Sequence, residues 1–498
     1  MKPASVCFLS KKSPKLGRVG NSLALEPLFH NHANALQIFR QWVLFKIVVG
    51  IADAFKEAQK AVPENLKNSE KIAKNFIDDL EQGNEPNFEN AIALSALKHL
   101  IDGWASDNRF RRCVLLLDDA AHAFSSLQQK DFFEIFRSLK SRTISPKAAV
   151  YPGMTSYSPN FHLGHDVKLI EAWYQPEEEG YLETMRELIK KRLPKKQVAD
   201  LLKEQELVDY LAVASFGLPR SFLTMISQLL SIEEDSPNKI SRDLARKAVV
   251  RNCFFTHGIF KSLSGKLPRY SHFVKAGREL AVAIIKELKR HNKSCSLKQK
   301  TVVVGIAEPI EPELDKILAL LEYAGIVRSI DTVSWNNNQS YRRYSVHYAL
   351  LIEKNALSLI GNYPLSMLIT TFTKHEHKNF LQSRGTQLLG NDFQTKCILD
   401  LAPCQNCGAD RAYDEAKFCV ECGRQLSDVS IYEELLKNSV DKLPLPRKKL
   451  ALLKEHSSIK IVQDILMDNE NQQVRKIKGI GPIWASRIRN AAEEFVSV

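Results

Sequence analysis

Two short cysteine repeats constrain the fold of this chain more than any other feature of its sequence. Cys404 and Cys407 stand in a Cys-x-x-Cys-Gly pattern that recurs at Cys419 and Cys422, with 11 residues between the two pairs. Each pattern can form a tight turn that directs two sulfur atoms at one point. Two such turns match a tetrahedral Zn²⁺ site of four thiolates, which has no open coordination position and is therefore structural.

The segment around these cysteines, residues 400–427, is too short to bury enough apolar surface to fold by itself. We therefore predict a zinc ribbon that depends on its metal for folding. A redox-active pair requires one Cys-x-x-Cys at the start of a helix that follows a strand. Two pairs that are each followed by glycine fit this alternative poorly, and two unrelated cysteine pairs are the remaining alternative.

Length and charge indicate several domains and a polyanionic partner. The 498 residues suffice for roughly three or four domains of ordinary size. With 70 basic and 57 acidic residues the net charge is +13, which favours nucleic acid as a partner. Basic soluble proteins without such a partner are also common, so the charge alone does not establish one.

The cysteine usage and the apolar segments favour a cytoplasmic protein. The other five cysteines are scattered along the chain, and together with a thiolate metal site they indicate a reducing compartment. The residues after Met1 do not form the apolar core of a signal peptide. The most apolar long stretch, residues 35–55, is interrupted by charged residues, which predicts a buried amphipathic helix and no membrane partner.

The N-terminal third alternates predicted strands with predicted helices, and this order favours a parallel α/β sheet. An apolar run that ends in an acidic residue, as at residues 113–118, is typical of a strand buried on both faces. Residues 62–90 are polar and contain a predicted loop. The predicted sheet elements cover residues 4–10, 113–118, 147–153 and 166–173, and the predicted helices cover residues 28–59 and 128–141.

Two acidic residues stand at the end of the strand predicted at 113–118. The run Val114-Leu-Leu-Leu-Asp118-Asp119 resembles the Walker B element of P-loop NTPases, in which an apolar strand ends beside the Mg²⁺ of the nucleotide. The resemblance implies that Asp118 holds Mg²⁺ through its water shell. Asp119 then stands where a glutamate usually polarises the attacking water. A buried strand with an exposed acidic end is the simpler alternative.

Two further features extend this resemblance. Thr155 and Ser156 follow the next strand, where AAA+ ATPases place a polar sensor for the γ-phosphate. Arg220 opens a later helix, as does the second sensor of that superfamily, whose arginine reaches the phosphates. In order and spacing, residues 1–235 resemble an AAA+ ATPase of the origin-recognition initiator type, with a winged helix following as in that family. The resemblance implies ATP and Mg²⁺ as ligands.

The phosphate-binding loop of these ATPases, the Walker A motif, is missing. No Gly-x-x-x-x-Gly-Lys-Ser/Thr occurs, and the nearest run, residues 17–22, has no lysine. Without that loop no row of N–H groups cradles the phosphates. The chain also begins at what corresponds to the second strand of the fold, so the expected AAA+ sheet is incomplete. We expect a shortened or mis-started ATPase that hydrolyses ATP hardly at all unless a Walker A lies upstream of Met1.

Residues 296–365 have the outline of a winged helix: a helix at 311–323, a polar turn and a strand at 341–348. The helix in the recognition position is mostly acidic, so phosphates would repel it. The wing could still touch a nucleic-acid backbone through its arginines, and packing between subunits is the competing use. These wing arginines are Arg328, Arg342 and Arg343.

The C-terminal residues 474–489 resemble a helix-hairpin-helix, in which two glycines allow a sharp turn before the second helix. N–H groups at such a turn point outward and, with the helix dipole, favour phosphate. Residues 445–467 look like a preceding, degenerate hairpin. A protein-docking module with solvated basic residues is the alternative. The predicted nucleic-acid-binding residues are Lys476, Lys478, Gly479, Gly481, Arg487 and Arg489.

These predictions combine into a multidomain α/β and α protein that binds DNA or another nucleic acid and carries structural zinc. The alternative is a non-enzymatic scaffold or adaptor, in which the ATPase-like core serves protein assembly, including assembly with further copies of itself. The predicted division is an AAA+-like core at 1–177, a helical lid and connector at 178–295, a winged-helix-like domain at 296–365, a linker at 366–399, the zinc ribbon at 400–427 and the hairpin tail at 428–498.

Overall fold

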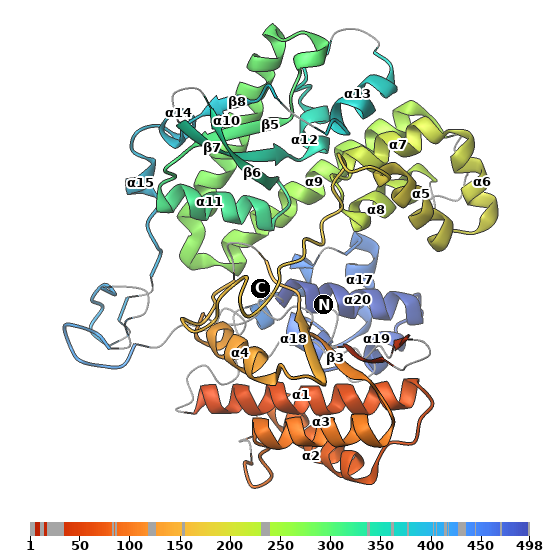
Figure 1. Ribbon diagram of the computed structural model, residues 1–498, viewed down its shortest axis with the longest axis vertical. Helices are drawn as coiled ribbons and strands as arrows, with labels where there is room; N and C mark the ends of the chain where they lie inside the picture. Colours follow the sequence, from red (N-terminus) through yellow and green to blue (C-terminus); the bar gives the residue numbers. More distant parts are fainter. Residues whose placement is uncertain are drawn as a thin grey trace. The chain divides into compact units, whose positions relative to one another are not determined.

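The computed structural model is a mixed α/β protein in which helices predominate (Figure 1). It separates into two units, one of Met1–Leu169 with Ala402–Val498 and one of Ile170–Leu401. The structure describes residues 5–9, 14–16, 34–81, 84, 87–117, 126–151, 155–230, 240–335, 339–359, 363–375, 378–401, 403–404, 406–412, 416, 418–426, 435–443, 445–468 and 471–496.

The N-terminal part of the first unit combines four helices with a small sheet. The helix predicted at 28–59 is α1, and from Ile38 onward its apolar residues are buried on all sides. Residues 62–90, in which only a loop was predicted, also contain the long helix α2. Its polar composition conceals a buried line of Leu66, Ala73 and Ile77. The bounds are α1 Ala35–Glu57, α2 Glu64–Glu81, α3 Leu94–Asp107, β3 Arg112–Leu117, α4 Ser126–Leu139 and β4 Ile144–Ala148.

The N-terminal sheet has the strand order β2-β1-β3-β4 and is mixed rather than parallel. β3 and β4 are parallel, as predicted, with Cys113 opposite Ile144, but the strand predicted at 147–153 overlaps β4 only at residues 147–148. β1 (Ser5–Leu9) is antiparallel to β3 and to β2 (Pro14–Leu16). Only four residues separate β1 from β2, and a parallel pair needs a crossover of about a dozen. The prediction of a wholly parallel sheet is therefore wrong.

The sheet element predicted at 166–173 does not form a strand. The described residues there contain only an isolated bridge between Leu163 and Val167. Leu169 and Ile170, two apolar residues in this range, are 57% and 77% exposed. Apolar residues that face solvent have no core to cover, so the segment stays irregular.

Helix α1 is the one helix in the described part of the chain that is long and apolar enough to cross a membrane, and it lies near the N-terminus. Its most apolar window is 78% buried within the protein. The polar side chains of Gln41 and Lys46 are buried as well: Gln41 accepts a hydrogen bond from the Ile92 amide, and Lys46 lies over the Trp42 ring. In this structure α1 is packed as a core helix against α2 and α4.

The second unit begins with six helices, which confirms the helical character predicted from 178 to about 290. The last two, α9 and α10, are long and pack against each other. Gly277 on α10 permits this packing, because a Cβ there would lie 2.6 Å from the Phe260 ring of α9. The bounds are α5 Tyr181–Arg192, α6 Lys195–Lys203, α7 Gln205–Ala214, α8 Pro219–Leu229, α9 Arg242–Lys266 and α10 Ser271–Ser294.

A second sheet, ordered β6-β7-β5-β8, completes this unit (Figure 1). The order of helix α11, then β6 and β7, follows the predicted outline of residues 296–365. β6 and β7 form an antiparallel hairpin, and β7 is also antiparallel to β5. The bounds are β5 Val303–Ala307, α11 Pro312–Tyr323, β6 Val327–Trp335, β7 Gln339–Val346 and α12 Tyr348–Glu353.

Residues 366–399 do not form the linker that was expected. β8 (Leu381–Ser383) pairs in parallel with β5 as the fourth strand of the sheet. Short helices surround it: α13 (Leu365–Phe372), α14 (Gly385–Leu389) and α15 (Phe393–Lys396). Elements this short carry little periodicity, so their place in the fold depends on burial against a distant strand that the local sequence does not show.

Candidate metal centre and nucleic-acid interface

The two cysteine turns have the same backbone geometry. In the first turn the Cys404 amide donates to the Ala409 carbonyl at 2.8 Å, and the Cys404 carbonyl accepts from the Gly408 amide at 2.8 Å. The second turn repeats both bonds at the same spacing from Cys419, at 2.8 and 2.9 Å. The equal offsets in the sequence therefore correspond to two copies of one local structure.

Glycine follows each cysteine pair because of backbone conformation. Gly408 and Gly423 have φ angles of +75° and +67°, which residues with a side chain adopt at a cost. A Cβ at either position would meet no atom within 4 Å, so crowding is not the reason. The left-handed backbone turns the chain directly after the second cysteine of each pair.

The four sulfur atoms converge, as the spacing predicted. The Sγ atoms of Cys404, Cys407, Cys419 and Cys422 all lie within 4.8 Å of one another. The Cys404–Cys422 and Cys407–Cys419 sulfur pairs are 3.6 and 3.5 Å apart. Zn–S bonds of about 2.3 Å in a tetrahedron place sulfurs about 3.8 Å apart. The cluster is thus compatible with a bound zinc ion and with a zinc ribbon.

The electrostatics of the cluster also suit a cation. The N–H of Arg424 lowers the pKa of Cys422 to about 6, and the N–H groups of Cys407 and Asn406 lower the pKa of Cys404. At Cys407 the Ala409 amide has the same effect, but the neighbouring thiols outweigh it and raise its pKa to about 12. Four thiolates in this volume repel one another, and a divalent cation removes that repulsion.

The C-terminal tail folds as two helix-turn-helix pairs around one apolar core. Residues 457–461 turn between α17 and α18, which form the preceding hairpin predicted at 445–467. Residues 476–481 turn between α19 and α20, and α20 packs against both α18 and α19. The bounds are α17 Arg447–His456, α18 Val462–Leu466, α19 Gln472–Arg475 and α20 Pro482–Val496.

The second turn brings the two predicted glycines to the surface. Gly479 has a φ angle of +94°, which favours glycine, and its carbonyl accepts from Lys449 Nζ at 2.7 Å. Ile477 and Ile480, on either side, are only 3% exposed and anchor the turn in the core. The same turn leaves Lys478 and Gly479 exposed to solvent.

Helix α20 begins with its first amides directed away from the helix. The Ala485 amide donates to the Gly481 carbonyl at 2.9 Å, so the amides that precede Ala485 have no acceptor within the helix. Pro482 supplies no N–H and suits the first helical position. Gly481 is exposed, and Ile483 is 73% exposed, so this helix start faces solvent.

Cations surround the Trp484 ring next to this helix start. The Arg487 guanidinium lies 5.1 Å from the ring centroid, and Lys449 Nζ lies 5.0 Å from it. These cation–π contacts hold two positive groups beside the turn. Sequence reasoning included Arg487 and noted the basic run that contains Lys449, but it did not assign Lys449 to the site and missed Trp484. The signals available were a basic run at 447–449 and an aromatic residue in the first turn of the second helix.

One predicted nucleic-acid residue has an internal role instead. Arg489 is half-buried, and its guanidinium donates to the Asp468 carbonyl at 3.0 Å. The Asp468 side chain is itself buried and accepts from the Gln473 and Val474 amides, each at 2.9 Å. This arrangement caps α19 and ties it to α20. Arg489 therefore supports the turn, whereas Lys476, Lys478 and Arg487 are exposed around it.

No protein-family model, curated protein or solved structure matches this chain. The resemblance to AAA+ ATPases therefore rests on the sequence motifs alone. The metal centre and the tail rest on the geometry described above.

Among the residues predicted to handle a nucleotide, Thr155 and Ser156 of the first unit make local hydrogen bonds. Asp118 and Asp119 lie outside the described residues. The Thr155 hydroxyl donates to the Tyr151 carbonyl at 2.9 Å and closes a local turn, and the Ser156 amide donates to a glutamine side chain. Arg220 is exposed in the first turn of α8, in the other unit.

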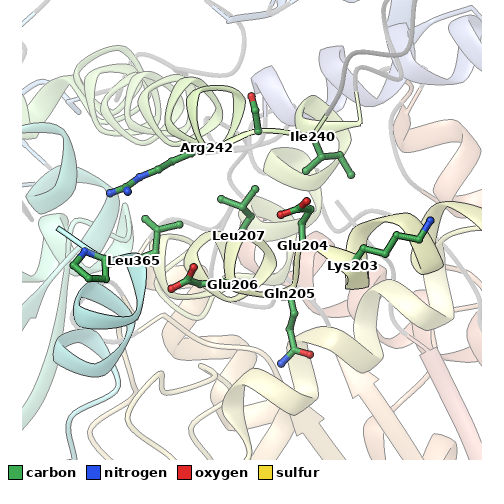
Figure 2. Close-up of a pocket in the computed structure, with 10 residues that line it drawn as sticks. Lys203, Glu204, Gln205, Glu206, Leu207, Ile240, Arg242 and Leu365 are labelled. Carbon is green, nitrogen blue, oxygen red and sulfur yellow. The ribbon is translucent and has the colours of Figure 1, made fainter. Parts of the chain in front are cut away.

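A pocket of about 330 Å³ lies in the second unit, and it contains none of the predicted site residues. Figure 2 shows charged and apolar side chains side by side around it. Glu206 accepts from the Ser366 amide at 2.9 Å, and Arg242 donates to the Tyr363 carbonyl at 2.8 Å. These polar groups fasten neighbouring segments to one another, and the mixed charge gives no basis for a phosphate site.

The arginines of the predicted wing are paired with carboxylates. Arg328 is 2% exposed and pairs with Glu177. Arg342 pairs with Glu308 and Asp315. Arg343 makes two hydrogen bonds of 2.6 Å to Asp331. Their positive charges are therefore compensated within this unit.

Proposed function

We propose that the C-terminal tail binds the sugar-phosphate backbone of a nucleic acid, DNA in the first instance, without reading its sequence. The observation that carries this proposal is the exposed turn at Lys478 and Gly479, which precedes a solvent-facing helix start. Amides at such a start and the helix dipole attract phosphate. The cations Lys476 and Arg487 add attraction that is independent of base identity.

The two glycines of the turn serve different purposes under this proposal. Gly479 is required by its backbone angle of +94°. Gly481 has no such angle, and a Cβ there would meet nothing within 4 Å in the protein. Its missing side chain leaves room for a phosphate to approach the amides of α20. The fold alone gives no reason for glycine at position 481.

Fluorescence anisotropy with labelled duplex DNA tests the proposal. We expect affinity to fall on the order of 10³-fold between 50 and 200 mM salt if about six phosphates are engaged. The Lys478→Glu/Arg487→Glu variant should weaken binding about tenfold or more on every sequence tested. Lys191→Glu/Arg192→Glu makes the same charge change on the exposed end of α5 and should have little effect. A flat salt response would favour the scaffold alternative.

We propose that residues 400–427 form a structural zinc ribbon. The convergence of the four sulfurs and the duplicated turn support it. Elemental analysis of the purified protein should find one zinc per chain, and Cys422→Ser should lose it. Cys295→Ser, at a half-buried cysteine outside the cluster, should retain it. Full zinc content in the Cys422→Ser protein would contradict this assignment.

We propose further that the N-terminal part derives from an AAA+ core of the origin-recognition initiator type, and that residues 296–365 correspond to a winged helix. The parallel β3–α4–β4 unit and the β6-β7-β5 order support these assignments. ATP turnover should be barely detectable. Turnover that Asp118→Asn abolishes would contradict the expected loss of hydrolysis. The carboxylate-paired wing arginines favour a use of that domain in protein assembly.

A further inference from the structure

A long stretch of the second unit has no acidic residue. Residues 244–278 contain eight lysines and arginines and no aspartate or glutamate. At the average of the whole chain, with 57 acidic residues in 498, this stretch would hold about four. It covers most of α9 and the start of α10. A one-sided charge of this kind favours a polyanionic ligand.

The exposed face of α9 places cations and an aromatic ring on one line. Lys247, Arg251, Phe254, Gly258 and Lys261 follow the spacing i, i+4, i+7, i+11 and i+14, which is one stripe of an α-helix. All five are exposed. Phe254 is 71% exposed, and the adjacent Phe255 is 57% exposed.

The opposite face of α9 fixes the orientation of this stripe. Cys253, Phe260 and Leu263 are at most 2% exposed, and the helix packs against α8, α10 and α12. The two phenylalanines therefore face solvent because the helix is held firmly on its other side. Ile259, one turn after Phe255, is 52% exposed as well, and an exposed apolar group of this kind on a packed helix marks an interaction surface.

The glycine in the middle of the stripe has no role in the fold. Gly258 lies inside the helix, where glycine is among the least favourable residues. It does not have a positive φ angle, and a Cβ there would meet no atom within 4 Å. Because Gly258 has no side chain, the helix surface one turn after Phe254 is flat, and a planar group can approach the backbone closely there.

The cations beside it are not compensated. Lys247, Arg251 and Lys261 form no ion pair with any residue in the described ranges. Glu353 acts on His257 of this helix and is paired with Lys354 at 3.0 Å. Asp243 lies one turn before Lys247 in the first turn of α9, and no ion pair joins them among the described residues. The stripe thus retains its positive charge.

We propose that this face of α9 binds single-stranded nucleic acid. Unstacked bases lie on Phe254 and Phe255, and Lys247, Arg251 and Lys261 hold the phosphates. An anionic membrane would require the apolar residues to be gathered on one side and the cations on the flanks. Here the cations share the central line with Phe254, which favours a strand that alternates bases and phosphates. The site belongs to the second unit and does not depend on the tail.

Anisotropy titrations of the full chain with fluorescein-labelled dT20 test the stacking. The Phe254→Ala/Phe255→Ala variant should bind dT20 at least about tenfold more weakly, because each stacked base contributes strongly to affinity. Its binding to duplex DNA should change less than twofold, since paired bases are not available for stacking. Ile170→Ala/Ile398→Ala removes two side chains of similar exposure, 77% and 57%, and should bind dT20 normally.

A substitution at Gly258 distinguishes an effect on dT20 binding from an effect on stability. Gly258→Leu should raise the melting temperature, because leucine is a far better helix former than glycine. The same variant should weaken dT20 binding several-fold, because its side chain covers the flat place. A purely structural glycine would give the opposite result, with lower stability and unchanged binding.

Two outcomes would overturn the proposal. One is unchanged dT20 affinity in Phe254→Ala/Phe255→Ala. The other is loss of binding to phosphatidylserine vesicles in that variant while dT20 binding persists, which would assign the face to a membrane. The tail is judged separately with Lys478→Glu/Arg487→Glu. If that variant binds duplex DNA normally while Phe254→Ala/Phe255→Ala loses dT20 binding, the tail proposal fails and this one stands. If the tail variant loses duplex binding while Phe254→Ala/Phe255→Ala binds dT20 normally, this proposal fails and the tail proposal stands.

Discussion

The β6–β7 hairpin and the C-terminal tail both carry clusters of cations, but the fold uses the two clusters in opposite ways. Arg328, Arg342 and Arg343 of the hairpin are each paired with carboxylates. Lys478 and Arg487 of the tail are exposed and have no ion pair within the described residues. The tail cations are therefore available to a polyanion, whereas the hairpin arginines are not.

The difference shows why a count of basic residues is a weak guide to a binding surface. A paired arginine contributes to packing and specificity of the fold, and its charge is compensated at short range. An exposed lysine beside unsatisfied amides contributes little to folding and is available to an external phosphate. Stability and affinity measurements can therefore distinguish the two clusters.

The largest effect is expected at Arg328. Its side chain is 2% exposed and its partner Glu177 is 15% exposed, so Arg328→Met leaves a carboxylate largely buried without its partner. Breaking a buried pair in this way costs about 3–5 kcal/mol. Urea unfolding should show this loss. Arg328→Met/Glu177→Gln, which removes both charges, should recover most of it.

The same variant tests the comparison directly. Nucleic-acid affinity of folded Arg328→Met should stay within twofold of the parent protein. If affinity falls while circular dichroism shows an intact fold, the hairpin contacts the ligand and the contrast with the tail is wrong.

A smaller effect is expected from pH in the unit that contains the hairpin. His347 is fully buried at the start of α12, where its Nδ1 accepts from the Ala349 amide at 3.2 Å. Burial lowers the pKa of His347 to about 3. Below about pH 6.5 the unfolded chain binds a proton that the folded chain does not, so stability is lost as the pH falls toward 3.

At pH 5 the loss from this group is about 2 kcal/mol relative to pH 7. Urea unfolding at a series of pH values measures it. His347→Gln should flatten the slope of stability against pH between 6.5 and 5, whatever its effect on stability at pH 7. His257 also has a lowered pKa and leaves a residual slope of the same sign. An unchanged slope in His347→Gln would contradict the prediction.

The sequence predicts best where structure is local. The two cysteine turns repeat the same bonds because each is complete within six residues, and the sulfurs converge as the spacing indicates. The turn at Gly479 is similarly local, since one left-handed residue and two buried isoleucines define it. The helices α1 and α11 were also predicted from their apolar residues. α11 agrees with the predicted range 311–323 within one residue, and the first residues of the helix predicted at 28–59 lie outside the described residues.

Features that depend on distant partners could not be predicted. Strand direction is one, because an alternating order of elements does not reveal that β1 runs antiparallel to β3. Ion pairing is another: Glu177 and Arg328 are 151 residues apart, and nothing near either residue indicates the other. The role of Arg489 was missed for the same reason, since its acceptor, the Asp468 carbonyl, lies 21 residues away in the segment after α18.

The two glycines of the tail turn are expected to affect different properties: Gly479 affects stability and Gly481 affects nucleic-acid binding. Gly479→Ala should destabilise the tail by about 1–2 kcal/mol, because its φ angle of +94° is unfavourable for alanine. Gly481→Ala should leave stability nearly unchanged and weaken nucleic-acid binding, because its methyl group projects where the phosphate approaches. Thermal unfolding and anisotropy on both variants measure this. Equal effects of the two substitutions would contradict the assigned roles.

The smallest effect on stability is expected at Arg343. A substitution there removes one compensated charge and can be compared with removal of one exposed charge in the tail. The Arg343 guanidinium is paired with the partly exposed Asp331 and lies 5.6 Å from the Phe380 ring centroid, so Arg343→Gln should change stability by less than about 1 kcal/mol. Arg487→Gln also removes one positive charge, next to Trp484. Only the second variant should reduce the slope of log affinity against log salt, by about one. Equal slopes in the two variants would show that a charge already compensated by a carboxylate attracts nucleic acid as well as an exposed one.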